Sequence, residues 1–137
     1  MIESKVEWQD GMHFIGELNG FQIPIDGGDS VGGRGLGPQP KGLSLTSLCG
    51  CTGMDVIYIL RKMKVEPDDF SVSATADVSE DHPKVFTKIH LVYKFKGPDL
   101  PVKKINKAVS LSMEQYCGVT AMLQKAADID YEIVIEE

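Results

Sequence analysis

Hydrophobic and polar residues alternate in three short runs at the start of the chain, Ser4 to Trp8, His13 to Leu18 and Gly20 to Ile25. Such alternation is typical of strands that bury one face. The pairs Asp10-Gly11 and Asn19-Gly20 separate the runs, and both favour tight hairpin turns. We therefore predict an N-terminal β meander over residues 1–26.

A glycine-rich segment follows over residues 26–41 and includes Pro38 and Pro40. It contains too little apolar surface to form a regular element. We predict a mobile loop. Its run from Gly32 to Gly37 matches neither the dinucleotide fingerprint nor the phosphate-binding P-loop, so we do not interpret it as a phosphate site.

A long helix is predicted from Gly42 to Met63, because apolar residues occupy nearly every side of its helical projection. A helix of this kind is typically central and buried. The cations Arg61 and Lys62 suit its C-terminus, where they oppose the helix dipole, and Pro67 marks the stop. The stretch from Gly42 to Leu60 has membrane length but contains Asp55, three glycines and several hydroxyls, so we interpret it as a core helix.

The rest of the chain predicts a hairpin, an interrupted helix and a last strand. Residues 70–78 and 89–95 alternate, with an acidic turn between them. A helical pattern begins at Pro101, breaks around Tyr116-Cys117-Gly118 and resumes from Val119 to Ala127, and residues 129–135 alternate again as an edge strand. Because strands and helices are not regularly interleaved, the fold class is α+β.

Composition narrows the function classes. The chain has 137 residues, 14 Lys and Arg against 20 Asp and Glu, and a net charge of -6. This length fits a single domain over residues 1–137, with the helix, hairpin, helix and strand core at 42–137. The excess of acidic residues gives no footprint for nucleic acid. Three cysteines and no apolar leader predict a cytoplasmic protein rather than a secreted one.

The cysteines are the main candidates for chemistry. Glycines flank Cys51 in its helix and leave its sulfur approachable, whereas Cys117 lies at the helix interruption, where free backbone N–H groups favour a thiolate. Cys49 lies about 200° around the helix from Cys51, so we expect it to pack elsewhere. The alternative is that all three cysteines are buried small hydrophobes. Their spacing alone does not show that Cys51 and Cys117 meet.

Other candidate residues are fewer. Asp55 follows Cys51 by four positions and shares its helix face, where it either orients a partner or binds hydroxyls across a dimer. A carboxylate so close also opposes thiolate formation. His13, His82 and His90 show no ligand spacing, so we predict no metal site.

Three segments resemble the OsmC/Ohr family of osmotically inducible and organic-hydroperoxide-resistance proteins. They are residues 37–63, which include Leu48-Cys49-Gly50-Cys51-Thr52-Gly53-Met54-Asp55, residues 80–91 and residues 108–119 around Cys117. The resemblance covers roughly residues 37 to 135. It implies an intertwined homodimer in which two long central helices, one of them interrupted, pack with antiparallel sheets.

The resemblance also implies the chemistry. Cys51 matches the peroxidatic cysteine of the family and Cys117 the resolving one. The substrate is then a small organic hydroperoxide, and an external dithiol, lipoyl-type by resemblance, reduces the resulting disulfide. No metal or organic cofactor is required, and no nucleic acid or membrane is involved.

One position departs from the family pattern. The peroxidase members have an acidic residue in a Pro-x-Glu arrangement, which orients an arginine from the N-terminal strands. Here Pro40-Lys41 is followed by Gly42, and the only arginines are Arg34 in the glycine-rich loop and Arg61 at the helix end. Lowering a thiol pKa by about two units requires roughly 2.7 kcal/mol of thiolate-favouring interaction. Arg34 is the residue we hypothesise to stabilise the thiolate of Cys51. The alternative interpretation is that Arg34 is a solvated loop residue without such a role.

The sequence therefore predicts a cysteine-based peroxidase in oxidative or osmotic stress defence, with Cys51 and Cys117 as catalytic residues and Arg34 and Asp55 as supporting ones. The second hypothesis is a non-catalytic binding protein of the same fold, which holds a small hydrophobic or thiol ligand at the dimer interface. The third is a scaffold with purely structural cysteines.

Overall fold

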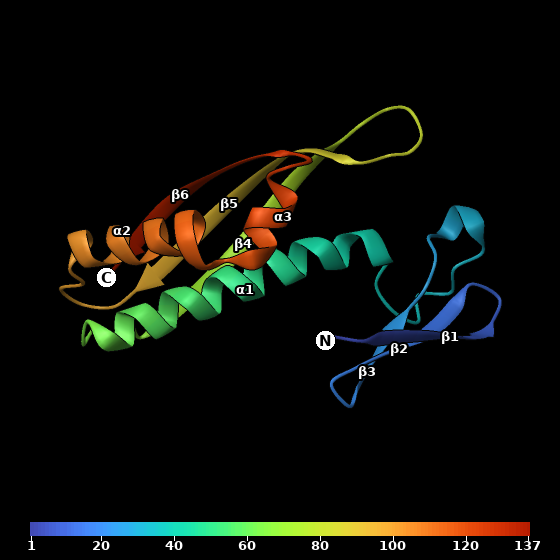
Figure 1. Cartoon of the computed structure of the whole chain (residues 1–137), viewed down its shortest axis with the longest axis horizontal. Coiled ribbons are helices and arrows are strands. Elements are labelled where there is room, and N and C mark those ends of the chain that lie inside the picture. Colours follow the sequence, from blue (N-terminus) through green and yellow to red (C-terminus); the bar gives the residue numbers. More distant parts are fainter. The chain divides into compact units, whose positions relative to one another are not determined.

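The computed structural model describes residues 1–137 and divides them into two compact units, Met1–Ser44 and Leu45–Glu137 (Figure 1). The long helix α1 (Pro40–Lys62) begins in the first unit and continues through the second. It starts two residues before the predicted Gly42. That the chain forms one domain stays a prediction.

The N-terminal unit contains the predicted meander. Strands β1 (Ser4–Asp10), β2 (His13–Leu18) and β3 (Phe21–Ile25) form an antiparallel sheet in the order β1-β2-β3. Asn19 and Gly20 connect β2 to β3 with positive φ angles of 53° and 83°. Two positive φ angles in succession suit the two-residue turns of hairpins, which is why the Asn-Gly pair predicted this turn.

The glycine-rich segment is more ordered than its composition predicts. It contains a short 3-10 helix, η1 (Asp29–Val31). The buried carboxylate of Asp26 accepts the backbone N–H groups of Arg34, Leu36 and Gly27 at 2.9, 3.1 and 2.8 Å. These hydrogen bonds, that from Arg34 foremost, lower the pKa of Asp26. The prediction of a segment without a regular element was therefore wrong, because one acidic side chain organises the backbone around it.

The C-terminal unit contains a second three-stranded sheet, in the order β4-β5-β6. Strands β4 (Asp69–Val78) and β5 (Phe86–Lys96) form the predicted antiparallel hairpin. Strand β6 (Asp128–Glu136) lies at the other edge of the sheet, as predicted, but pairs in parallel with β5. The expectation of antiparallel sheets is therefore wrong for this sheet, because the helical crossover between β5 and β6 brings the chain back in the direction of β5. Side chains on β5 alternate between buried and more exposed, and the buried ones are Ile89, Leu91, Tyr93 and Phe95.

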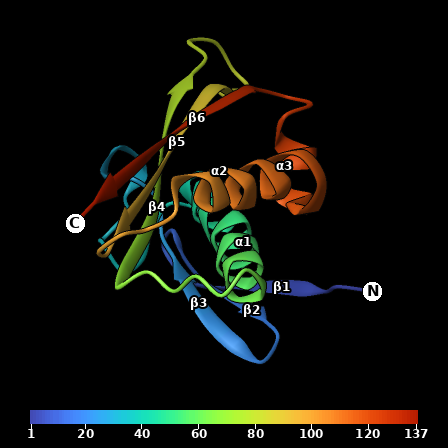
Figure 2. The ribbon, with the colours of Figure 1, turned by 90° about the vertical axis from the view of Figure 1, so that its left-hand side faces the viewer.

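An interrupted helix connects β5 to β6. It consists of α2 (Val102–Leu111), the π-helical turn η2 (Ser112–Tyr116) and α3 (Gly118–Leu123), with Cys117 in extended conformation between the last two. The predicted break at Tyr116-Cys117-Gly118 is confirmed, although α3 ends four residues before the predicted Ala127. Figure 2 shows α1, α2 and α3 on one face of the β4-β5-β6 sheet.

Helix α1 is buried along one stripe only, formed by Leu48, Thr52, Val56 and Leu60 at intervals of four residues. Met54 and Tyr58 on its other sides are 76% and 60% exposed. The prediction of a helix buried on every side is therefore wrong for the single chain, because the sheet and α2 cover one side of it. By length and composition alone α1 would also suit a membrane span, since an 18-residue window within it has a mean hydropathy of 1.5, but its buried apolar residues belong to the core of the C-terminal unit.

Candidate functional site

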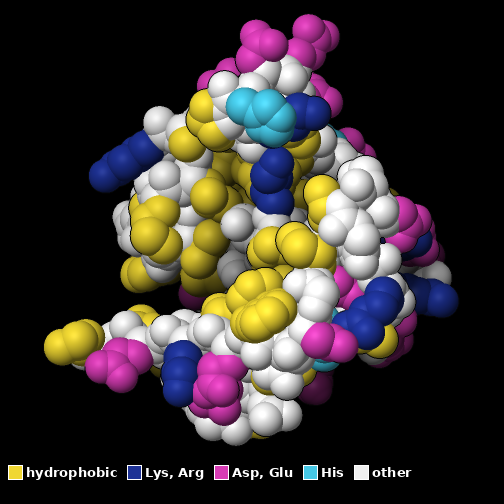
Figure 3. All heavy atoms as spheres, turned by 90° about the vertical axis from the view of Figure 1, so that its right-hand side faces the viewer, with side chains coloured by type: hydrophobic (Ala, Val, Ile, Leu, Met, Phe, Trp, Pro, Cys, Tyr) yellow, Lys and Arg dark blue, Asp and Glu magenta, His cyan; other side chains and the backbone are white.

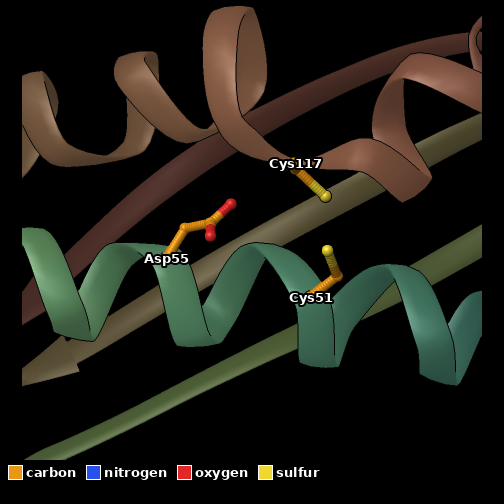
Figure 4. Close-up of side chains that lie close together, drawn as sticks. All are labelled: Cys51, Asp55 and Cys117. Atoms are coloured by element: carbon orange, nitrogen blue, oxygen red, sulfur yellow. The ribbon is translucent and has the colours of Figure 1, made fainter.

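Cys51 on α1 and Cys117 before α3 face each other, and Asp55 lies one helical turn along α1 from Cys51 (Figure 4). The two sulfur atoms and a carboxylate oxygen of Asp55 all lie within 4.8 Å of one another. Both cysteines are free thiols in the structure. The structure therefore brings together three of the four predicted site residues.

The break in the second helix is what turns Cys117 toward α1. The π-helical turn ends with the N–H of Cys117 bonded to the carbonyl of Ser112 at 2.8 Å. Cys117 then leaves the helix with φ -76° and ψ 104°, and Gly118 starts α3. Single π-helical turns are frequent at functional sites, since they displace one side chain from the regular helical register.

The surroundings of Cys117 act on its thiol in opposite directions. The backbone N–H of Thr120 donates to its sulfur at 3.4 Å, which confirms the expected contact with a helix start. Burial has the larger effect, since Cys117 is only 4% exposed, and its pKa is raised. The neighbouring Cys51 raises it further. The helix start thus favours the thiolate as expected, but desolvation outweighs this hydrogen bond and keeps the pKa of Cys117 above its usual value.

A chain of buried hydroxyl groups extends from Asp55 into the core. Ser112 donates to Asp55 Oδ2 at 3.0 Å, and the Thr52 hydroxyl lies 2.7 Å from those of both Ser112 and Tyr93. Because an ionised carboxylate only accepts, Ser112 accepts in turn from Thr52, and Thr52 from Tyr93. Burial raises the pKa of Tyr93 to about 12, so its hydroxyl keeps its proton.

Asp55 was expected either to orient a partner or to bind hydroxyls across a dimer, and within the chain its hydroxyl partner is Ser112. Thr52, Ser112 and Tyr93 come from three different elements and were not identified as site residues. The one signal in the sequence was their polarity at positions where the pattern predicts burial.

Arg34 lies in the N-terminal unit, where its guanidinium forms an ion pair with Asp10. This pair raises the pKa of Arg34. None of the ion pairs in the structure includes Asp55. Gly42 lies in the first turn of α1, with open space around the position of a Cβ atom. The supporting role of Arg34 stays a prediction.

Cys49 points into a different region from Cys51, as the helical projection predicts. It lines an apolar groove between α1 and β4, together with Gly50, Gly53, Met54, Ile57, Tyr58, Phe70 and Val72 among others. Burial raises the pKa of its thiol. The two glycines were expected to open the surroundings of Cys51, but they line the groove of Cys49 instead.

Comparisons with known proteins identify relatives that match this chain over most of its length. Residues 32–132, more than half of the chain, match the family described as OsmC-like protein. Protein YhfA of Escherichia coli strain K12 is 37% identical over 138 residues, which cover 97% of this chain and 98% of that protein.

Two solved structures illustrate the shared fold. A hypothetical protein from Aquifex aeolicus superposes with a TM-score of 0.84 at 29% identity, covering 100% of this chain and 98% of that one. An organic hydroperoxide resistance protein, OsmC, from Legionella pneumophila superposes with a TM-score of 0.73 at 15% identity, covering 98% and 96%. With the α+β fold, the interrupted helix and the two facing cysteines in place, the chain belongs to the OsmC-like protein family.

Proposed function

We propose that this protein is a cytoplasmic thiol peroxidase that reduces organic hydroperoxides in defence against oxidative or osmotic stress. The observation that carries the proposal is the proximity of two free thiols, with the sulfur atoms of Cys51 and Cys117 within 4.8 Å of each other. The fold shared with the hydroperoxide resistance protein of Legionella pneumophila agrees with it.

The proposed reaction has three steps: oxidation of Cys51, formation of the disulfide with Cys117, and reduction of that disulfide. The thiolate of Cys51 attacks one oxygen of the hydroperoxide, the O–O bond breaks, and an alcohol leaves after taking up a proton. Cys51 is then a sulfenic acid. The thiol of Cys117 attacks that sulfur, water leaves, and a disulfide forms. A small dithiol of lipoyl type reduces the disulfide by exchange and becomes a cyclic disulfide itself.

The difference in burial between the two cysteines supports the roles that this proposal gives them. Cys51 is half-buried, so an organic hydroperoxide has access to its sulfur, whereas Cys117 is buried and has a raised pKa. A resolving thiol needs proximity more than acidity, because it attacks a sulfenic acid that is already held beside it. We therefore propose Cys51 as the peroxidatic cysteine and Cys117 as the resolving one.

The apolar surface of α1 supports a homodimer, the state typical of the family. Met54 and Tyr58 are exposed beside the groove that Phe70 and Val72 line, and its volume is about 660 Å³. Figure 3 shows hydrophobic side chains at the surface on one face of the molecule. A second copy of the chain would remove this surface from water, at about 25 cal/mol for each Å² buried.

The test is hydroperoxide consumption by the reduced protein with dihydrolipoamide as reductant. We expect turnover with cumene hydroperoxide that exceeds turnover with hydrogen peroxide, because the site is bordered by apolar side chains. Cys51→Ser should abolish turnover. Cys117→Ser should allow one turnover that stops at the sulfenic acid, and Cys49→Ser, outside the site, should retain activity.

A wild-type protein that consumes neither peroxide would contradict the proposal. It would favour the non-catalytic binding protein instead, a hypothesis to which Gly42 in place of the family's acidic residue gives specific support. Mass spectrometry of the protein purified under native conditions would then identify the small hydrophobic or thiol ligand.

A further inference from the structure

The three side chains at the site carry donor atoms that metal ions bind, in addition to the two thiols of the proposed redox pair. Their two sulfur atoms and one carboxylate oxygen lie within 4.8 Å of one another and point into a common space (Figure 4). A tetrahedral zinc ion holds sulfur at about 2.3 Å and carboxylate oxygen at about 2.0–2.2 Å, which places two ligand sulfurs about 3.8 Å apart. The ligand atoms, all within 4.8 Å of one another, therefore need to move by only about 1 Å to reach such a separation.

Charge favours a cation at this position. Two thiolates and a carboxylate would together carry three negative charges, and no lysine or arginine in the structure forms an ion pair with Asp55. The two thiols carry this charge only after losing their protons, and three negative charges this close are then stable only when a counter-charge compensates them. A divalent ion supplies that charge and, being thiophilic, matches two sulfur ligands.

The surrounding hydrogen bonds already hold the carboxylate in place. Ser112 donates to Asp55 at 3.0 Å, and Ser112 is in turn bonded to Thr52 at 2.7 Å. Hydrogen bonds of this kind orient the ligands of many metal sites. Three protein ligands leave the fourth position of a tetrahedral ion open for water.

We propose that Cys51, Asp55 and Cys117 form a reversible site for a thiophilic divalent cation, Zn²⁺ in the cell, which blocks peroxidation while the thiols are reduced. The regulatory part of this inference rests on the proposed function. Binding releases two thiol protons and engages the sulfur of Cys51, so the sulfur no longer attacks a hydroperoxide. Formation of the Cys51–Cys117 disulfide removes two of the three ligands and releases the ion.

The binding part is tested with the reduced, chelator-treated protein and Co²⁺ as a spectroscopic probe, followed by displacement with Zn²⁺. We expect one ion per chain and a thiolate-to-Co²⁺ charge-transfer band. The band should be lost in Cys51→Ser and Cys117→Ser and retained in Cys49→Ser, the matched control. Asp55→Asn should weaken Zn²⁺ binding by at least the roughly 10- to 100-fold that loss of an outer hydrogen-bond partner costs, because Asp55 is itself a ligand. Absence of the band, or a band unchanged in Asp55→Asn and Cys117→Ser, would overturn the site.

A second arm separates this inference from the proposed function. Thiol loss on addition of cumene hydroperoxide is followed in the metal-free protein and in the protein with one equivalent of Zn²⁺. If the metal-free protein loses its thiols rapidly, if Zn²⁺ suppresses this loss and if a chelator then restores it, the result supports both the peroxidase proposal and the regulatory role of the metal. Rapid loss that Zn²⁺ leaves unchanged overturns the regulatory role alone. Absence of thiol loss in the metal-free protein refutes the peroxidase proposal and with it the regulation, while the Co²⁺ band still reports on the site.

Discussion

At the scale of single residues, the Thr52 hydroxyl joins the site to the core. It is fully buried and lies 2.7 Å from the hydroxyls of Tyr93 and Ser112, so it links β5 to the π-helical turn. An apolar substitute of the same shape would leave the buried hydroxyl of Tyr93 without this partner, whereas Ser112 would keep its hydrogen bond to Asp55. Buried polar groups that lose a partner cost more than the hydrogen bond itself contributes.

We therefore predict that Thr52→Val lowers the free energy of unfolding by about 1–3 kcal/mol. Urea denaturation of the reduced protein measures the change. The matched control is Thr75→Val on β4, where the side chain is exposed and the expected change is within about 0.5 kcal/mol. Equal stability changes for the two variants would show that the network contributes nothing.

Residue spacing predicted only part of the site. The four-residue interval between Cys51 and Asp55 placed both on one face of a helix, and the structure agrees. Cys117 lies 66 positions beyond Cys51, and no local rule connects residues at such a distance. The resemblance to a known family supplied that pairing. The contact of Ser112 with Asp55 was not predicted, because a serine in a helical pattern does not indicate which carboxylate it contacts.

At the scale of elements, His90 connects the central strand β5 to the edge strand β6. Its Nδ1 lies 2.6 Å from Asp130 and its Nε2 lies 2.9 Å from Glu132. Hydrogen bonds to Asp130 and then Glu132 raise the pKa of His90, and the same contact lowers the pKa of Asp130. The contact therefore stabilises the pair of strands when His90 is charged.

The sign of the pH dependence follows from these two shifts. The His90 contribution is fully present below the unfolded pKa of about 6.5 and is lost as the pH rises through the raised folded value. The Asp130 contribution is present above the unfolded pKa of about 3.9 and is lost as the pH falls through the lowered folded value. We predict that NMR titration finds a lower His90 pKa in Asp130→Asn than in the wild type, with Asp128→Asn as the unchanged control. An unaltered His90 pKa in Asp130→Asn would contradict the contact.

A disulfide between Cys51 and Cys117 would join α1 to the start of α3. On the loop-entropy account, closing 66 residues stabilises the folded chain by roughly 4 kcal/mol. We predict that the oxidised protein unfolds at a higher temperature than the reduced one, as measured by calorimetry. A melting temperature equal to or below that of the reduced form would count against a well-fitted pair.

Most elements were predictable because their patterns are long and periodic. The meander, the hairpin and the helix break all follow from alternation, Asn-Gly turn chemistry and the position of Gly118. The 3-10 helix near Asp26 was not predicted. The buried carboxylate of Asp26 accepts three backbone N–H groups there, and such contacts produce no periodic pattern in the sequence. The parallel pairing of β6 with β5 also depends on the crossover through α2 and α3, which strand patterns do not encode.

At the scale of the whole molecule, an apolar helix with one buried stripe predicts a partner. The exposed Met54 and Tyr58 lie beside the groove of Phe70 and Val72. We predict that light scattering after size exclusion finds a dimer, and that Met54→Asp shifts it toward the monomer because a charge would have to be desolvated in the interface. Val102→Asp, exposed at the start of α2, is the control that should stay dimeric. A monomeric wild type would show that the exposed face of α1 has no second copy on it.

The central claim is that Cys51 and Cys117 act as one redox unit. The most direct measurement is the intact mass and free-thiol count of the reduced, metal-free protein after one equivalent of cumene hydroperoxide, with peptide mapping of any bridge. We predict a mass lower by two hydrogens, the loss of two of three thiols and a bridge between Cys51 and Cys117, with hydrogen peroxide slower. Three free thiols, or a bridge that includes Cys49, would contradict the account.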